Sequence, residues 1–151
     1  MKNIVIPITI AAIALLMLAG CGEVTELVLE DTWAIEEIRA GDLITTDLDD
    51  YLEVTFDASN DEATLTVGPD WDELSNVEVT GTFDFTVDGT DKTITLSQSG
   101  DPKYVITYEL ENQLDRMVWM SWVAVDRDPT VDIVGDSAVI EYIAFNRQTS
   151  S

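Results

Sequence analysis

The sequence predicts an all-β protein, folded as an eight-stranded up-and-down antiparallel barrel, with a two-sheet β-sandwich as the alternative. Three observations lead to this prediction. Apolar and polar residues alternate in many short segments, which gives a sheet with one buried face. Turn signals rich in Asp, Gly and Asn separate these segments. Eight such segments in about 120 residues suit a small barrel, and no helix of useful length is convincing.

The strands are predicted one after another along the chain. The clearest segment is 77–87, where Val, Phe and Gly occupy the odd positions and Glu, Thr and Asp the even ones. Gly81 in its middle predicts a bend or bulge, and Asp88-Gly89 predicts a hairpin into the next strand. Single helical turns are possible within 42–50 and 69–76. The predicted strands cover residues 32–38, 51–56, 63–67, 77–87, 93–96, 104–110, 117–125 and 138–147.

The segment 117–125 differs from the others because both of its faces are apolar. Strict alternation places Met117 and Trp119 on one face and Met120 and Trp122 on the other. The second face is covered by the loop around Trp71 or the N-terminal segment, or it is an exposed patch for a partner. A partner patch requires Met120 and Trp122 to be substantially exposed.

The first twenty residues have the pattern of a secretory signal peptide. Lys2 precedes an apolar run over 4–19, and small residues follow it. As a helix this run spans roughly 24 Å, less than the ~30 Å hydrocarbon core of a bilayer. We therefore expect a cleaved signal over 1–20 rather than a permanent membrane span.

Leu18-Ala19-Gly20-Cys21 resembles the lipobox of bacterial lipoproteins, and Cys21 is the only cysteine. The resemblance implies cleavage before Cys21, a diacylglycerol thioether on its sulfur and acylation of the new amine. It also implies a lipid-anchored protein of the bacterial cell envelope, and Gly22 in place of Asp favours the outer membrane. Residues 21–30 are then the lipidated N-terminus and tether, 31–148 the β domain and 149–151 a tail.

Composition excludes several kinds of chemistry. Without His and with one Cys, the chain cannot build a Ser–His–Asp or Cys–His nucleophile, a His/Cys zinc site or an iron–sulfur site. The acidic stretches 47–53 and 126–128 lack the spacing of a calcium-binding loop, so no metal site is expected. Removing the signal takes away Lys2 and leaves 6 basic against 30 acidic residues, a charge of −24. We expect no enzyme activity, no cofactor and no nucleic-acid partner, since such a charge repels nucleic acid.

Four parts of the chain resemble the lipocalin-like domains of small bacterial lipoproteins, over about residues 30–148. They are a first strand with Trp33, the strand 52–56 before an acidic turn, the strand 81–85 before Asp88-Gly89, and a closing 145–147. In lipocalins a Gly-X-Trp opens the first strand and an Arg near the last strand stacks on that Trp. Here Asp31 stands in place of the Gly. The resemblance implies that Arg147 lies over the Trp33 ring.

A barrel of this size holds one small ligand or is filled by side chains. The first interpretation is a lipid-anchored, lipocalin-like module for a small apolar ligand or an envelope protein. The alternative is an interaction lipoprotein with a filled core that docks a protein partner through 117–125. The candidate residues for the interior cavity are Trp33, Phe56, Phe83, Phe85, Tyr104 and Tyr108.

Overall fold

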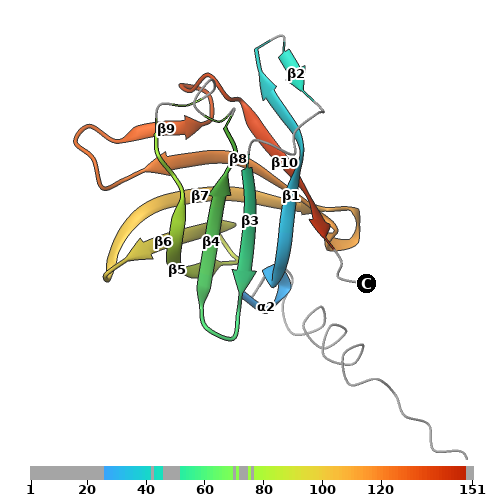
Figure 1. Cartoon of the computed structure of the whole chain (residues 1–151), viewed down its shortest axis with the longest axis vertical. Helices are drawn as coiled ribbons and strands as arrows, with labels where there is room; N and C mark the ends of the chain where they lie inside the picture. The colour runs from blue at the N-terminus through green and yellow to red at the C-terminus, as the bar shows by residue number, and fades with distance from the viewer. Residues whose placement is uncertain are drawn as a thin grey trace, which may run out of the picture.

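The computed structural model describes residues 26–41, 43–45, 52–69, 71, 75 and 77–148, and for 43–45 the backbone alone. The expected signal peptide over 1–20, Cys21 and the tail over 149–151 lie outside these residues. The described chain is almost entirely β-structure and forms a closed eight-stranded antiparallel barrel, as the sequence predicts (Figure 1). The barrel strands are β1 (Asp31–Ala40), β3 (Leu52–Asp57), β4 (Glu62–Val67), β5 (Gly81–Asp88), β6 (Thr93–Gln98), β7 (Asp101–Glu111), β8 (Arg116–Ala124) and β10 (Tyr142–Gln148).

The barrel closes because β10 pairs with two strands at once. From β3 to β8 each barrel strand pairs with the next barrel strand along the chain, which is up-and-down order. β10 pairs with β8 through Ile143 and Trp119, and with β1 through Arg147 and Trp33. Every barrel strand therefore has a partner on both sides, and the two-sheet sandwich is excluded. Closure also removes the exposed sheet edges at which other chains could pair.

Two strands outside the barrel and two short helices were not predicted. β2 (Leu43–Thr45) pairs with the end of β1, and β9 (Val131–Val134) pairs with the end of β8. With three and four residues, these strands are too short to show a period of two. The helices are single turns, α2 (Glu26–Leu29) and the 3-10 helix η2 (Asn112–Leu114).

The predicted strand boundaries are wrong where apolar residues alternate outside a strand. β5 begins at Gly81 rather than at residue 77, although Val77 and Val79 are buried. Gly81 has a φ of +156°, and a Cβ there would lie 3.4 Å from the Phe83 ring. It therefore starts the strand rather than bending its middle. In the same way, β10 begins at Tyr142 rather than at residue 138.

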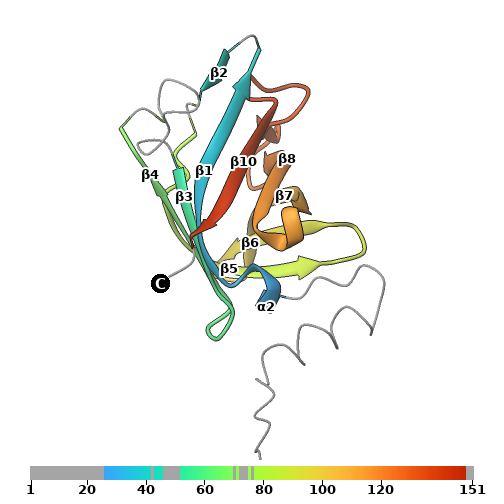
Figure 2. The ribbon, with the colours of Figure 1, turned by 90° about the vertical axis from the view of Figure 1, so that its right-hand side faces the viewer.

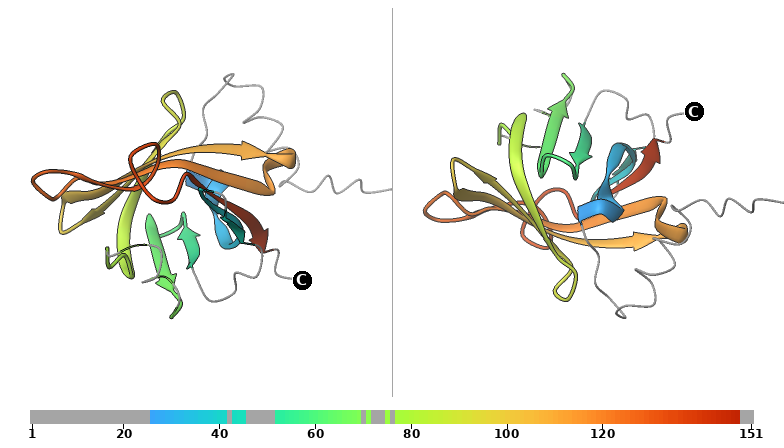
Figure 3. Two further views of the ribbon diagram at one scale, coloured as in Figure 1. Left: turned by 90° about the horizontal axis from the view of Figure 1, so that it is seen from above. Right: turned by 90° about the horizontal axis from the view of Figure 1, so that it is seen from below.

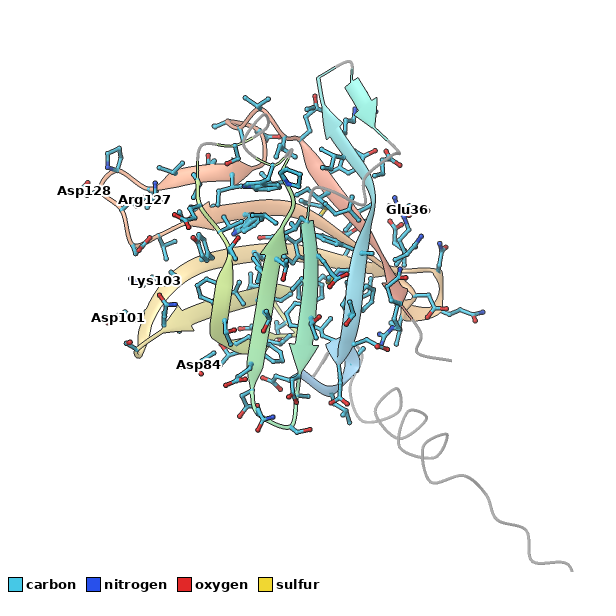
Figure 4. The ribbon with its side chains drawn as sticks, in the orientation of Figure 1. Glu36, Asp84, Asp101, Lys103, Arg127 and Asp128 are labelled. Atoms are coloured by element: carbon cyan, nitrogen blue, oxygen red, sulfur yellow. The ribbon has the colours of Figure 1, made fainter. Side chains whose placement is uncertain are left out.

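The two ends of the barrel differ, as Figures 1 and 2 show. We call one end the α2 end; it carries α2, η2 and the turns 58–61 and 89–92. The other, the β9 end, carries β2, β9 and the described parts of the segment 68–80. At the α2 end Leu29 is fully buried, and at the β9 end Trp71 is buried. Buried apolar side chains fill the space between the two ends, and charged side chains such as Glu36, Asp101 and Asp128 point away from the wall in Figure 4.

Candidate functional site

The interior contains the aromatic residues that were predicted to line a cavity, and they pack against one another. Phe56 and Phe85 have ring centroids 5.1 Å apart, and Phe83 and Tyr104 meet edge to face at 5.5 Å. Trp33 and Tyr108, the other two candidates, are also buried. Such tilted and edge-to-face contacts are the favoured arrangements of aromatic pairs. The six candidates therefore do lie inside the barrel, but not in a single cluster.

Four further aromatic residues belong to the interior and were not among the candidates. Trp122 stands at their centre, with its ring 5.1 Å from Trp119, 5.7 Å from Trp71 and 5.8 Å from Tyr104. Trp119 in turn lies 4.7 Å from Phe145. We call Trp71, Phe83, Tyr104, Trp119, Trp122 and Phe145 the aromatic cluster. It extends from Trp71 at the β9 end into the barrel, whose wall Figure 3 shows from above and from below.

The expected partner patch of Met120 and Trp122 is wrong for Trp122. Trp122 is 0% exposed and Met120 is 40% exposed. The cause is a shift of register in β8, where Trp119 pairs with Tyr108 and Ser121 pairs with Thr107. Met120 is the extra residue of this bulge, so the alternation changes phase and both tryptophans point inward. Strict alternation could not reveal this, because a bulge has no signature in this stretch of sequence.

Met120 borders a surface hollow instead. The hollow has a volume of about 270 Å³ and is lined by Met120, Ser121, Asp132, Val134, Gly135, Asp136 and Ser137. It lies between β8, β9 and the turn that follows β9, outside the barrel. Its lining mixes two apolar side chains with two carboxylates and two hydroxyls.

Two rings of the aromatic cluster donate hydrogen bonds to the backbone of segment 77–80. Trp71 donates from Nε1 to the Val77 carbonyl at 3.1 Å, and Tyr104 donates from Oη to the Glu78 carbonyl at 3.1 Å. Burial, with the nearby Asp126 carboxylate, raises the pKa of Tyr104. The β9 end of the interior is thus held by neutral donors bonded to backbone carbonyls.

Three buried donors of the interior lack any such acceptor. They are Trp119 Nε1, Trp122 Nε1 and Tyr108 Oη, none of which has a hydrogen-bond partner among the described atoms. Trp33 and Trp71, by contrast, donate to the carbonyls of Leu29 and Val77. Burying a donor without an acceptor costs about 1–3 kcal/mol, and folded proteins rarely leave such groups unpaired. Two of the three unpaired donors belong to neighbouring rings of one cluster.

Tyr108 lies toward the α2 end, apart from the aromatic cluster. Burial raises its pKa to about 12, and the carboxylates of Asp88 and Glu26 add to the shift. Both effects favour the neutral phenol, because the phenolate would be poorly hydrated and close to negative charge. Tyr108 is therefore a neutral donor throughout the physiological range.

Arg147 lies over Trp33, as the resemblance implies. Its guanidinium carbon is 4.5 Å from the centre of the Trp33 ring, within cation–π range. The same guanidinium donates to the carbonyls of Val28 at 2.7 Å, Glu30 at 3.0 Å and Leu114 at 3.1 Å. It therefore joins β10 to α2, to β1 and to η2, and it closes the α2 end of the barrel.

The charges of the wall do not form a site for an anion. Arg39, Lys103, Arg116 and Arg147 each lie within 4.0 Å of a carboxylate, the last beside Asp31 at 3.6 Å. Arg116 contacts Glu36 at 2.7 Å and also pairs with Glu111, and these carboxylates raise its pKa. The chain has 30 acidic against 7 basic residues, so negative charge is in large excess. This excess of negative charge repels anions.

The residues that the structure describes contain neither a cluster of metal-binding side chains nor a helix that could cross a bilayer. No three His, Cys, Asp or Glu side chains gather there as a metal ion would require. The acidic stretch 47–53 lies mostly outside those residues. Within the same residues, no helix has the length and apolar character needed to cross a bilayer. Comparison with family models, with curated proteins and with solved structures gives no match.

Proposed function

We propose that this protein is a lipid-anchored binding module of the bacterial cell envelope whose barrel takes up a small, neutral and largely apolar molecule. The proposal has two parts with separate support. The lipobox at 18–21, with its single cysteine, supports the anchor. The closed barrel and its aromatic cluster support the binding of a small molecule. The chain has no His and one Cys, so it cannot build a Ser–His–Asp or Cys–His nucleophile, and we propose binding rather than catalysis.

The observation that carries the binding function is the pair of unpaired indole donors in the aromatic cluster. Trp119 and Trp122 have neighbouring rings, and each buries its Nε1–H group without an acceptor. A core that serves only to fill the barrel gains nothing from two such groups, because apolar rings of the same shape avoid the desolvation cost. A ligand with a carbonyl or ether oxygen would accept from an indole and place its apolar body against the rings.

Docking of a protein partner is the second candidate. The rings of the cluster stand only 4.7–5.8 Å apart, which is typical of a filled core. Met120 is exposed beside the hollow next to β9, and it offers an apolar contact on an otherwise polar wall. If the interior takes no ligand, this surface is where we expect a partner.

Titration with Nile red, a neutral apolar dye that carries a carbonyl, separates the two candidates. We expect saturable binding, seen as a rise in dye emission and a fall in tryptophan emission. Trp119→Phe and Trp122→Phe keep an aromatic ring, although a smaller one, and remove the donor, so one or both should weaken binding by roughly three- to tenfold. Met120→Ala is the matched control and should bind as the wild type does. Binding that is weakened by Met120→Ala and not by the tryptophan variants would favour the surface instead.

The anchor is tested separately by Cys21→Ser in the producing cell. Without the sulfur no thioether can form, and we expect the protein to leave the membrane fraction. Mass spectrometry of the N-terminal peptide of the wild type should show the added acyl chains, since stable attachment takes two or more of them. A Cys21→Ser protein that stays with the membrane would contradict this part of the proposal.

A further inference from the structure

The N-terminal segment that precedes the barrel is fixed to it. In α2, Glu26 accepts a hydrogen bond through Oε1 from the backbone N–H of Val87 in β5, at 3.2 Å. Leu29 is fully buried, and its carbonyl accepts the indole N–H of Trp33 at 2.9 Å. Residues 26–30 therefore belong to the domain, although the sequence suggests a tether over 21–30.

Arg147 holds the same segment from the opposite wall. It donates to the carbonyls of Val28 and Glu30, on either side of the buried Leu29. Contacts from β1, β5 and β10 thus converge on four residues, and the chain enters the domain at one defined point. Between Cys21 and Glu26 there are only five Cα–Cα steps, which reach at most about 18 Å.

From this we infer that the barrel stands on the bilayer with its α2 end toward the lipid and its β9 end away from it. The inference rests on the proposed anchor at Cys21. β1 has ten residues, about 33 Å along the strand, which at the usual tilt of a barrel is a height of roughly 25 Å. Placing the β9 end against the bilayer would raise α2 by this height, and the chain from Cys21 is too short to allow it.

The negative charge of the α2 end explains why the domain does not adhere to the lipid headgroups. The turns of the α2 end carry Asp57, Asp61, Asp88 and Asp91, and the outer wall carries further carboxylates. Anionic headgroups repel such a surface, so attraction to lipid cannot set the orientation. The length of the tether sets it instead. The Met120 hollow and the aromatic cluster behind Trp71 then face the space away from the anchoring membrane, where a ligand or partner arrives.

Two exposed serines at opposite ends provide a matched test. Ser59 lies in the β3–β4 turn of the α2 end, and Ser137 lies after β9. In the lipidated protein Cys21 is blocked, so Ser59→Cys and Ser137→Cys each give one free thiol for the same fluorophore. The labelled lipoproteins are inserted into phosphatidylcholine vesicles that contain a small fraction of rhodamine-labelled lipid. Energy transfer to the headgroups then reports the distance of each end from the bilayer.

We expect transfer from the label at 59 to be several-fold more efficient than from the label at 137, in neutral and in anionic vesicles alike. Equal transfer from the two positions, or stronger transfer from 137, would overturn the orientation while leaving the anchor intact. Flotation with the vesicles is scored in the same samples. If the wild-type protein does not float, or if Cys21→Ser floats equally well, the anchor itself is refuted and the orientation with it.

Discussion

Arg147 makes the most specific structural prediction, because one side chain joins three elements at the α2 end. The perturbation is Arg147→Ala, with Arg147→Lys as its partner variant. Alanine removes the cation over Trp33 and all the hydrogen bonds to backbone carbonyls. Lysine keeps the charge but loses the planar fork of donors that reaches several carbonyls at once.

The magnitude follows from the contacts. A partly buried cation–π contact at 4.5 Å contributes about 1 kcal/mol. The hydrogen bonds to Val28 at 2.7 Å and Leu114 at 3.1 Å come from a charged donor that is 16% exposed, and we assign about 1.5 kcal/mol to each. The ion pairs with Asp31 and Asp115, at 3.6 and 3.9 Å, add little because both carboxylates are in contact with water.

Arg147→Ala should therefore lower the free energy of unfolding by about 4 kcal/mol, a large share of the ~5–15 kcal/mol of a typical domain. Leu114 adds to this expectation, because η2 holds it at a φ of +73° and Arg147 binds its carbonyl. A left-handed conformation at a leucine persists only where its surroundings enforce it. Arg147→Lys should cost about half as much as Arg147→Ala.

The assay is urea unfolding of the mature chain carrying Cys21→Ser, followed by tryptophan fluorescence. The urea midpoint should fall while the slope stays constant, as it does when a contact of the native state is lost. Arg39→Ala is the control, since Arg39 pairs with Glu141 at 3.2 Å where both side chains are about half exposed. That variant should lose less than about 0.5 kcal/mol. A loss below about 1 kcal/mol for Arg147→Ala would refute the reasoning.

Three more predictions concern the core and the charge. Tyr108→Phe removes a buried hydroxyl that has no partner, so stability at pH 7 should be unchanged or slightly higher. Folding raises the pKa of Tyr108 from about 10 in the unfolded chain to about 12. The stability that this shift provides is present below pH 10 and should be lost as the pH rises through 12. Tyr108→Phe should lessen this loss in urea titrations at high pH. Trp122→Ala should cost about 3–5 kcal/mol and Met120→Ala less than about 1 kcal/mol; similar losses would contradict the bulge in β8. The melting temperature should rise with NaCl up to and beyond physiological strength, because salt screens the repulsion among 30 carboxylates. A flat response would contradict a destabilising role for this repulsion.

The fold was predictable because local sequence patterns specify most of the strands and turns of the barrel. Strands such as β3 and β4 alternate strictly between buried and exposed residues, and Asp88-Gly89 marks the turn after β5. The pairing of Trp33 with Arg147 was also reached, by resemblance. Both kinds of prediction depend only on which residues occur in which order.

The site was less predictable, because it depends on register. A single bulged residue, Met120, turns Trp122 into the interior and joins it to Trp71, which lies about fifty residues earlier in the chain. The four tryptophans are alike in the sequence, yet two of them find carbonyl acceptors and two do not. Local alternation carries no information about either difference.

By itself, then, the sequence determined the excess of acidic residues, the lack of histidine and the succession of strands, since these follow from composition and from short-range periodicity. Only the tertiary structure decided that β10 closes the wall, that residues 26–30 belong to the barrel, and that two indole N–H groups lie buried without an acceptor. These features arise where segments far apart in the chain meet. Their energies depend on the distances and directions between the segments, which residue order alone does not specify.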